Sequence, residues 1–246
     1  MFEPTIPFGE PELIRVSAFQ RYLDDLAGCG STMPPRPSLL SSSLLSDLRR
    51  VNQGGVKTEV LEVLAACIRH GQDAQVHLQA DEKVLPLTVF VHERLVHCPM
   101  DMASFLALPL HEMAVLHVEP AMLRPIGDRE AALVADPAEY HSLGGLMWEL
   151  ALRTRDDLLP EIAGPAAYRV TPGLDLHGLM VSDEQNAAIE RLQHRTTSLR
   201  YIAKWPGLDR EAAVRLLNAL YLQAGLMVSR SHPEAVAESW LSALGR

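Results

Sequence analysis

Hydrophobic and polar positions follow the clearest pattern between Ser182 and Arg230, where the chain is predicted to form three helices and a short strand. Ser182 and Gln185 fit a capping box at the start of the first helix, because a hydroxyl and an amide side chain can satisfy its free backbone amides. Trp205-Pro206-Gly207 ends the second helix, since proline cannot continue the helical hydrogen bonds. This order of elements is typical of a small winged-helix unit.

The third predicted helix has the broadest apolar stripe. Asp209 is placed to cap its N-terminus, and Gly225 is expected to adopt left-handed dihedral angles after its C-terminus. The segment Leu226–Val228 is short, apolar and strand-like. The apolar residues, spaced as on one face of a helix, are Ala212, Ala213, Leu216, Leu217 and Leu220.

The opposite face of that helix is the predicted docking surface. Between Ser182 and Arg230, seven Lys or Arg residues stand against five Asp or Glu residues. A unit that neutralises about six to ten DNA phosphates usually has a plainly basic face, so we favour a protein partner over DNA. The candidate partner-binding residues are Arg210, Arg215, Asn218 and Tyr221, and Glu211 and Val214 are also predicted to point outward.

A β-rich block occupies the middle of the chain. Gln75–Gln79 alternates as a strand, Leu85–His92 is rich in β-branched residues, and Leu95–Cys98 forms a third short strand. Polar turns between these segments indicate an antiparallel meander, which Met113–Val118 is expected to join. A helix over Lys57–His70 precedes it. The predicted fold class is α+β: an antiparallel β meander with flanking helices, followed by an all-helical, winged-helix-like C-terminal unit.

Three stretches divide the chain. Residues 1–45 are predicted to hold a helix over Pro11–Leu26 and a linker rich in Gly, Pro and Ser. Residues 46–165 form the α+β domain. Residues 166–246 form the winged-helix-like domain, reached through a loop-like connector over Gly164–Gly178.

Composition indicates a soluble protein of the cytoplasm with no membrane partner. The 246 residues are 48% hydrophobic and 22% charged, as in globular proteins. No apolar run approaches the roughly 18 to 20 residues of a membrane span, and the N-terminus does not resemble a signal peptide. Three widely spaced cysteines predict no disulfide framework. The net charge of −9 argues against nonspecific affinity for nucleic acid or anionic lipid.

An amphipathic helix over Ser142–Leu159 carries Leu146, Glu149, Arg153 and Asp156, and the C-terminal unit adds a series of mostly apolar positions. Those positions are Ser198-Leu199, Ile202-Ala203, Leu208, Leu216-Leu217, Leu220 and Gly225-Leu226. In this order of elements, from about Leu45 to Val228, the chain resembles the PATAN family, named for the N-terminal domain of the PatA response regulator. The resemblance implies a bacterial signalling adaptor that acts beside receiver-domain proteins without catalysis of its own.

Residues able to carry chemistry are sparse and do not match known motifs. The histidines and cysteine of the meander have no zinc-ligand spacing, so we predict no metal site. The pair His111-Glu112 begins like a zincin motif but lacks its second histidine. Asp156-Asp157 is interpreted as a solvated helix end, and Ser41–Ser43 as a loop or helix cap. The residues considered as metal ligands are His77, His92, His97 and Cys98.

Three functional hypotheses remain, and none assigns a catalytic residue or a cofactor. The first is a cytoplasmic signalling or scaffold protein that binds a protein partner and whose tail supports dimerisation. The second is a winged-helix transcription regulator that reads DNA with the third tail helix. The third is a small-molecule-binding or hydrolytic domain built from dispersed histidines and acids. The surface of the third tail helix discriminates between the first two.

Overall fold

The computed structural model describes residues 13–28, 40–53, 60–110, 113–154 and 156–235. The chain divides into two compact units, Met1–His141 and Ser142–Arg246. This division precedes the predicted domain boundary at residue 165, so the amphipathic helix after Ser142 belongs to the second unit.

The first unit is built on an antiparallel sheet with strand order β5-β2-β3-β4-β6. The short strand β1 lies outside this order and also pairs with β3. Strands β2, β3 and β4 confirm the predicted meander. The polar turn between β2 and β3 places Asp81 at a positive φ of 54°. The strands are β1 (Ile14–Arg15), β2 (Ala74–Ala80), β3 (Lys83–Phe90), β4 (Leu95–His97), β5 (Ala114–Pro120) and β6 (Tyr140–Ser142).

Helices α1 (Val16–Gly28), α2 (Ser42–Gln53), α3 (Val60–His70) and α4 (Met102–Leu106) accompany this sheet, with short 3-10 turns at Ala131–Leu133 and Pro137–Glu139. Helix α3 is buried along most of its length, because its apolar residues face in more than one direction, and α2 packs along it. Helix α2 was not predicted. Its first turn uses the serine cluster as a cap, since the Leu44 amide donates to the Ser41 hydroxyl at 3.3 Å.

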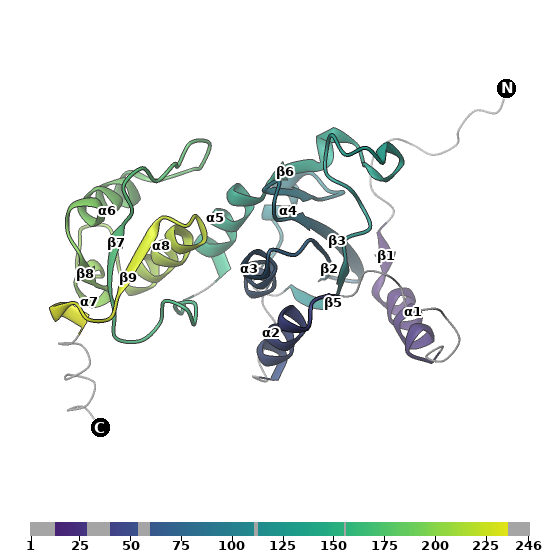
Figure 1. Cartoon of the computed structure of the whole chain (residues 1–246), viewed down its shortest axis with the longest axis horizontal. Coiled ribbons are helices and arrows are strands. Elements are labelled where there is room, and N and C mark those ends of the chain that lie inside the picture. Colours follow the sequence, from purple (N-terminus) through teal and green to yellow (C-terminus); the bar gives the residue numbers. More distant parts are fainter. Residues whose placement is uncertain (1–12, 29–39, 54–59, 111–112, 155, 236–246) are drawn as a thin grey trace. The chain divides into compact units, whose positions relative to one another are not determined.

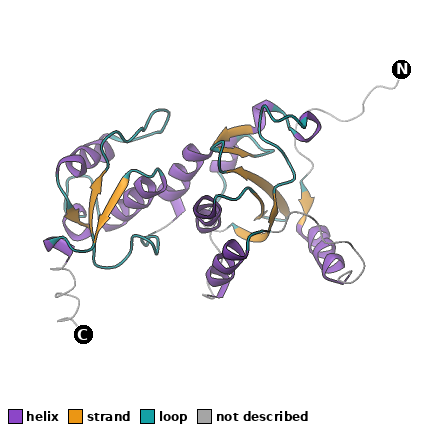
Figure 2. Ribbon diagram, viewed as in Figure 1, coloured by secondary structure: helices purple, strands orange, loops and turns teal. Residues whose placement is uncertain are grey.

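The second unit contains α5 (Leu143–Thr154), β7 (Ala167–Val170), α6 (Asp183–His194), β8 (Thr197–Ser198), α7 (Leu199–Ile202), α8 (Arg210–Leu222) and β9 (Leu226–Ser229). The prediction of an all-helical C-terminal unit is wrong, because these strands form a three-stranded antiparallel sheet in the order β8-β7-β9. Figure 2 shows β7 beside β9. The central strand, β7, lies in the stretch predicted to be a loop-like connector.

Helix caps in this unit follow the local sequence closely. The predicted capping box of Ser182 and Gln185 is present at the start of α6, and the Asp209 carboxylate accepts from the Ala212 amide at 2.7 Å. The expected left-handed cap at Gly225 is wrong, because Ala224 takes that conformation, with φ at 55°. Gly225 serves another need: a Cβ there would lie 2.4 Å from a methyl carbon of Leu174.

Among the residues that the structure describes, no helix has both the length and the apolar composition needed to cross a membrane.

Candidate partner-binding surface

Asn218 does not lie on an outward face of α8, contrary to prediction. Its side chain is fully buried, with 0% exposure. The side-chain oxygen accepts from the Leu159 amide at 2.9 Å, and its amide group donates to the Asp157 carbonyl at 2.9 Å. Asn218 therefore ties α8 to the segment that follows α5, and it cannot touch a partner directly.

The other three predicted docking residues differ in how far they are accessible. Arg210 is exposed in the first turn of α8, whereas Arg215 and Tyr221 are half-buried. The Arg215 guanidinium pairs with the Asp156 carboxylate through two N–H donors, one of them at 3.1 Å. Val214, also expected outside, is 1% exposed. The four predicted residues thus do not form one open surface.

Burial of α8 has a simple cause: the helix packs against α5 within the second unit (Figure 1). Apolar residues point from α8 in several directions, so it is a core helix with only its first turn and a narrow edge exposed. The buried residues are Ala213, Val214, Leu216, Leu217, Asn218, Ala219 and Leu220. A helix that reads DNA needs a free face to enter the major groove. Most of α8 lacks one.

A pocket of about 270 Å³ lies beside the exposed edge of α8. Ala212 and Arg215 line it from α8, Leu152 from α5 and Glu184 from α6. Its volume is below the roughly 300 to 1,000 Å³ usual for small-molecule sites. Hydrogen bonds from the Glu184 amide and the Ser182 hydroxyl lower the pKa of the Glu184 carboxyl, which stays ionised at the rim.

A second surface, formed by the end of α6 and by α7, was not predicted. The Arg191 guanidinium lies over the Trp205 ring, 5.5 Å from its centroid, and the Lys204 ammonium lies 5.6 Å from the Tyr201 centroid. Arg191, Lys204 and Tyr201 are exposed, and Trp205 is half-buried. We call these four residues, with the exposed Arg200, the α6–α7 surface. Its signal in the sequence is a long segment without acids, which the net charge of the whole tail conceals.

Acidic groups beside this surface are already bonded within the unit. The Glu234 carboxylate accepts from the Thr197 hydroxyl at 2.6 Å and the Ser198 amide at 2.9 Å, and it also binds Arg195 at 3.1 Å. Burial alone would raise the pKa of the Glu234 carboxyl, but these hydrogen bonds and the Arg195 charge together lower it. Glu234 thus anchors the β8–α7 junction as a carboxylate.

The histidines of the first unit are paired with glutamates. His77 Nε2 lies 2.9 Å from a Glu119 carboxylate oxygen, and His97 Nε2 lies 2.8 Å from one of Glu139. Both rings are buried, with 7% and 6% exposure, so neither is presented to solvent. Burial raises the pKa of the nearby Cys98 thiol to about 11, which leaves it protonated at neutral pH. Within the described part of the chain, no three metal-binding side chains gather; residues 111 and 112 lie outside it.

Register places several of these groups in one row across the sheet. Glu119, Gln75, Thr88 and His97 are successive partners on β5, β2, β3 and β4, and side chains in such a row share a face. We call these four residues the polar row. Thr88 is 1% exposed, and its hydroxyl has no hydrogen-bond partner among the described residues. Beside the row, burial lowers the pKa of His117, more than the charge of Glu119 raises it.

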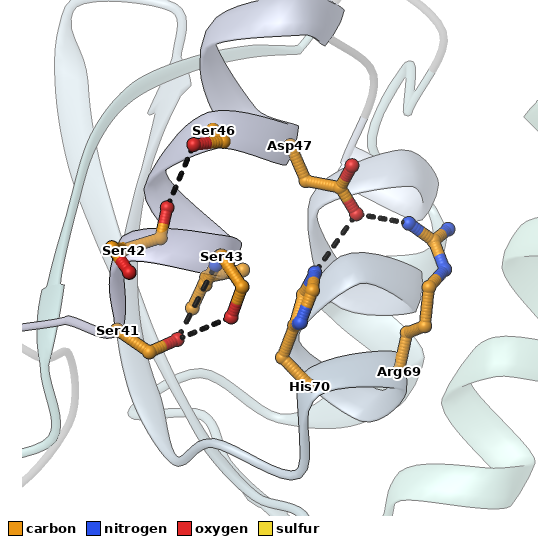
Figure 3. A network of polar contacts seen from close by, with 8 residues as sticks. Ser41, Ser42, Ser43, Ser46, Asp47, Arg69 and His70 are labelled. Atoms are coloured by element: carbon orange, nitrogen blue, oxygen red, sulfur yellow. Dashed lines mark hydrogen bonds and ion pairs between the residues drawn. The ribbon is translucent and has the colours of Figure 1, made fainter.

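Figure 3 shows a further polar cluster, which joins α2 to α3. Asp47 of α2 accepts from the Arg69 guanidinium and from His70 Nε2, the latter at 2.9 Å. The serines bond with one another and with the α2 backbone, as in the 2.8 Å bond from Ser46 to the Ser42 carbonyl. His70 pairs with a carboxylate rather than a serine hydroxyl. The cluster therefore links α2 to α3.

Comparison of the chain with protein-family models, with curated proteins and with solved structures finds no match.

Proposed function

We propose that this protein is a non-catalytic cytoplasmic signalling or scaffold protein that acts by binding a protein partner through its second unit. The observation that carries the proposal is the burial of α8 against α5, with Asn218 bonded inside. A helix used in this way stabilises a docking unit and is poorly placed to read bases. The resemblance to PATAN proteins implies a receiver-domain protein as the partner.

We further propose that the second unit is a winged-helix variant. Its elements α6, α7, α8 and β9 keep the predicted order of three helices and a closing strand, and the short strand β8 lies between α6 and α7. Strand β7 comes before them in the chain yet pairs between β8 and β9, where it completes the small sheet. In this variant, α5 covers a face of the third helix that would otherwise be open.

The types of residue exposed around α7 support a protein partner. Tyr201 is 47% exposed, although a tyrosine ring is a large apolar group. Tyrosine, tryptophan and arginine are enriched at the centres of protein interfaces, where a few such side chains supply most of the binding free energy. The α6–α7 surface contains all three types.

The test is capture of partners from the native host by the tagged full-length chain, compared with its Tyr201→Ala and Asn186→Ala variants. Both positions are exposed, but only Tyr201 belongs to the α6–α7 surface. We expect a partner that binds the wild-type chain and Asn186→Ala at least about fivefold better than Tyr201→Ala. Equal capture by all three chains would contradict docking through this surface.

A DNA-binding measurement on the same chain tests the leading alternative, a winged-helix transcription regulator. We expect no tight complex with duplex DNA at physiological salt. A submicromolar complex whose affinity falls steeply with salt, and which Arg210→Ala with Arg215→Ala abolishes, would support the transcription-regulator hypothesis instead.

A further inference from the structure

The cations of the second unit are unevenly distributed along the sequence. From Arg191 to Leu208 the chain has four Lys or Arg residues and no Asp or Glu. The rest of the protein carries eighteen Lys or Arg residues against thirty-one Asp or Glu residues. A small basic segment therefore stands in a strongly acidic protein. Such segregation creates a local positive potential even when the net charge is negative.

Folding brings this segment into one surface instead of spreading it around the unit. Contact between Arg191 and the Trp205 ring joins the end of α6 to the turn after α7. Lys204, the neighbour of Trp205 in the chain, lies over the Tyr201 ring and so continues this surface onto α7. The two aromatic rings thus lie next to the charged groups of Arg191 and Lys204.

One of the four cations between Arg191 and Leu208, Arg195, pairs with a carboxylate of the same unit. Glu234 is occupied by Thr197, Ser198 and Arg195. The Ser182 hydroxyl donates to Glu184 at 2.8 Å. Among the described residues, Arg191 and Lys204 instead lie over aromatic rings.

We propose, building on the proposed adaptor function, that the α6–α7 surface binds a short acidic segment of its protein partner. Carboxylates of that segment would pair with the guanidinium and ammonium groups, and its apolar side chains would cover the Tyr201 ring. Complementary charge gives such a contact its specificity and its association rate.

A short peptide segment fits this surface better than a nucleic acid does. The α6–α7 surface has three cations, Arg191, Arg200 and Lys204. A protein that binds duplex DNA at physiological salt makes about six to ten phosphate contacts. An extended polyanion would also reach the surrounding acidic residues, whereas a short segment remains over the cations. Outside Arg191–Leu208, the second unit carries seven Lys or Arg residues against twelve Asp or Glu residues, and this negative excess penalises the longer ligand.

The experiment measures fluorescence anisotropy with the full-length protein and three labelled probes of similar length. The first is a peptide of alternating Asp and Glu, the second is its Asn and Gln counterpart, and the third is a duplex DNA of matched charge. We expect the acidic peptide to bind at least about tenfold more tightly than either other probe, with an affinity that decreases as salt is added.

Charge-reversal variants locate the binding. Arg191→Glu with Lys204→Glu should weaken acidic-peptide binding by about tenfold or more, since both changes lie in the α6–α7 surface. The charge-matched control is Lys83→Glu with Arg129→Glu, two exposed positions of the first unit, and it should change the affinity less than about twofold. Circular dichroism of each variant verifies folding.

Each other result counts against the proposal. Equal weakening by both double variants would show a general charge effect with no defined site. Tighter binding of the duplex would overturn both the acidic-segment proposal and the preference for a protein partner. No binding of the acidic peptide would overturn the acidic-segment proposal alone, because the Tyr201 capture experiment tests the adaptor function separately.

Discussion

Thr88 of the first unit and Asn218 of the second are both buried polar residues, yet their surroundings differ. Both polar atoms of the Asn218 side chain, its oxygen and its nitrogen, form hydrogen bonds with backbone groups that follow α5. The Thr88 hydroxyl lies in the polar row without a partner among the described residues. A satisfied buried polar group fixes how two segments meet, whereas an unsatisfied one costs free energy on folding. Similar burial therefore has opposite consequences in the two units.

The units also differ in charge. Met1–His141 carries eleven Lys or Arg residues against nineteen Asp or Glu residues, and Ser142–Arg246 carries eleven against twelve. The second unit is nearly neutral only because its cations, concentrated near α7, balance acids elsewhere. Net charge per unit thus conceals the feature most relevant to binding.

The largest expected effect is on the core of the second unit. Leu217→Ala removes a fully buried side chain of α8 and should lower the free energy of unfolding by roughly 2 to 5 kcal/mol. All three tryptophans of the chain, Trp148, Trp205 and Trp240, belong to the second unit. Urea unfolding followed by tryptophan fluorescence therefore reports on this unit. An unchanged midpoint would contradict the central position of α8.

Asn218→Ala should have the next largest effect, about 1 to 3 kcal/mol in the same measurement, because it leaves the Leu159 amide and the Asp157 carbonyl without their partner. If Asn218 pointed outward, as the sequence pattern predicts, this substitution would be nearly neutral. Asn186→Ala, at an exposed position of α6, is the matched control and should have little effect. If the two asparagine variants unfold alike, the described packing of α8 is wrong.

Thr88→Val should stabilise the first unit by about 1 kcal/mol, because it replaces the unpaired hydroxyl with a methyl group of similar size. The strands β2, β3 and β4 should then exchange their amide hydrogens more slowly, as measured by mass spectrometry. Faster exchange would show that the hydroxyl makes a stabilising contact, and the contrast with Asn218 would disappear.

The smallest expected effect concerns pH. Burial lowers the pKa of His117 in the folded state, so the unfolded chain takes up a proton more readily. The stability of the first unit should therefore decrease as the pH falls through about 6.5 and below, and the loss should be smaller in His117→Gln. The groups facing His117 are Glu119, His77 and the Phe19 ring. Hydrogen exchange between pH 7 and 5.5 checks this, after correction for intrinsic exchange rates; equal pH dependence in both proteins would exclude His117 as the cause.

Candidate-site residues were predicted less well than the fold. Periodicity alone placed Asn218 opposite the leucines of α8, which is correct for an isolated amphipathic helix. The error arose because α5 covers a second face of α8, and nothing in the α8 sequence indicates a second covering element. The α6–α7 surface was missed for a different reason: charge was counted over the whole tail, and not along the segment from Arg191 to Leu208.

The sequence by itself determined the features that depend on neighbouring residues. Capping at Ser182 and Asp209, the strands of the meander and their polar turns all arise from contacts between residues close in the chain. Only the tertiary structure decided that β7 is a central strand, because its partners Ser198 and Ser229 lie far along the chain. It likewise decided that Asn218 is buried. Local preferences have a short range, whereas burial and strand pairing depend on which distant segments the fold brings together.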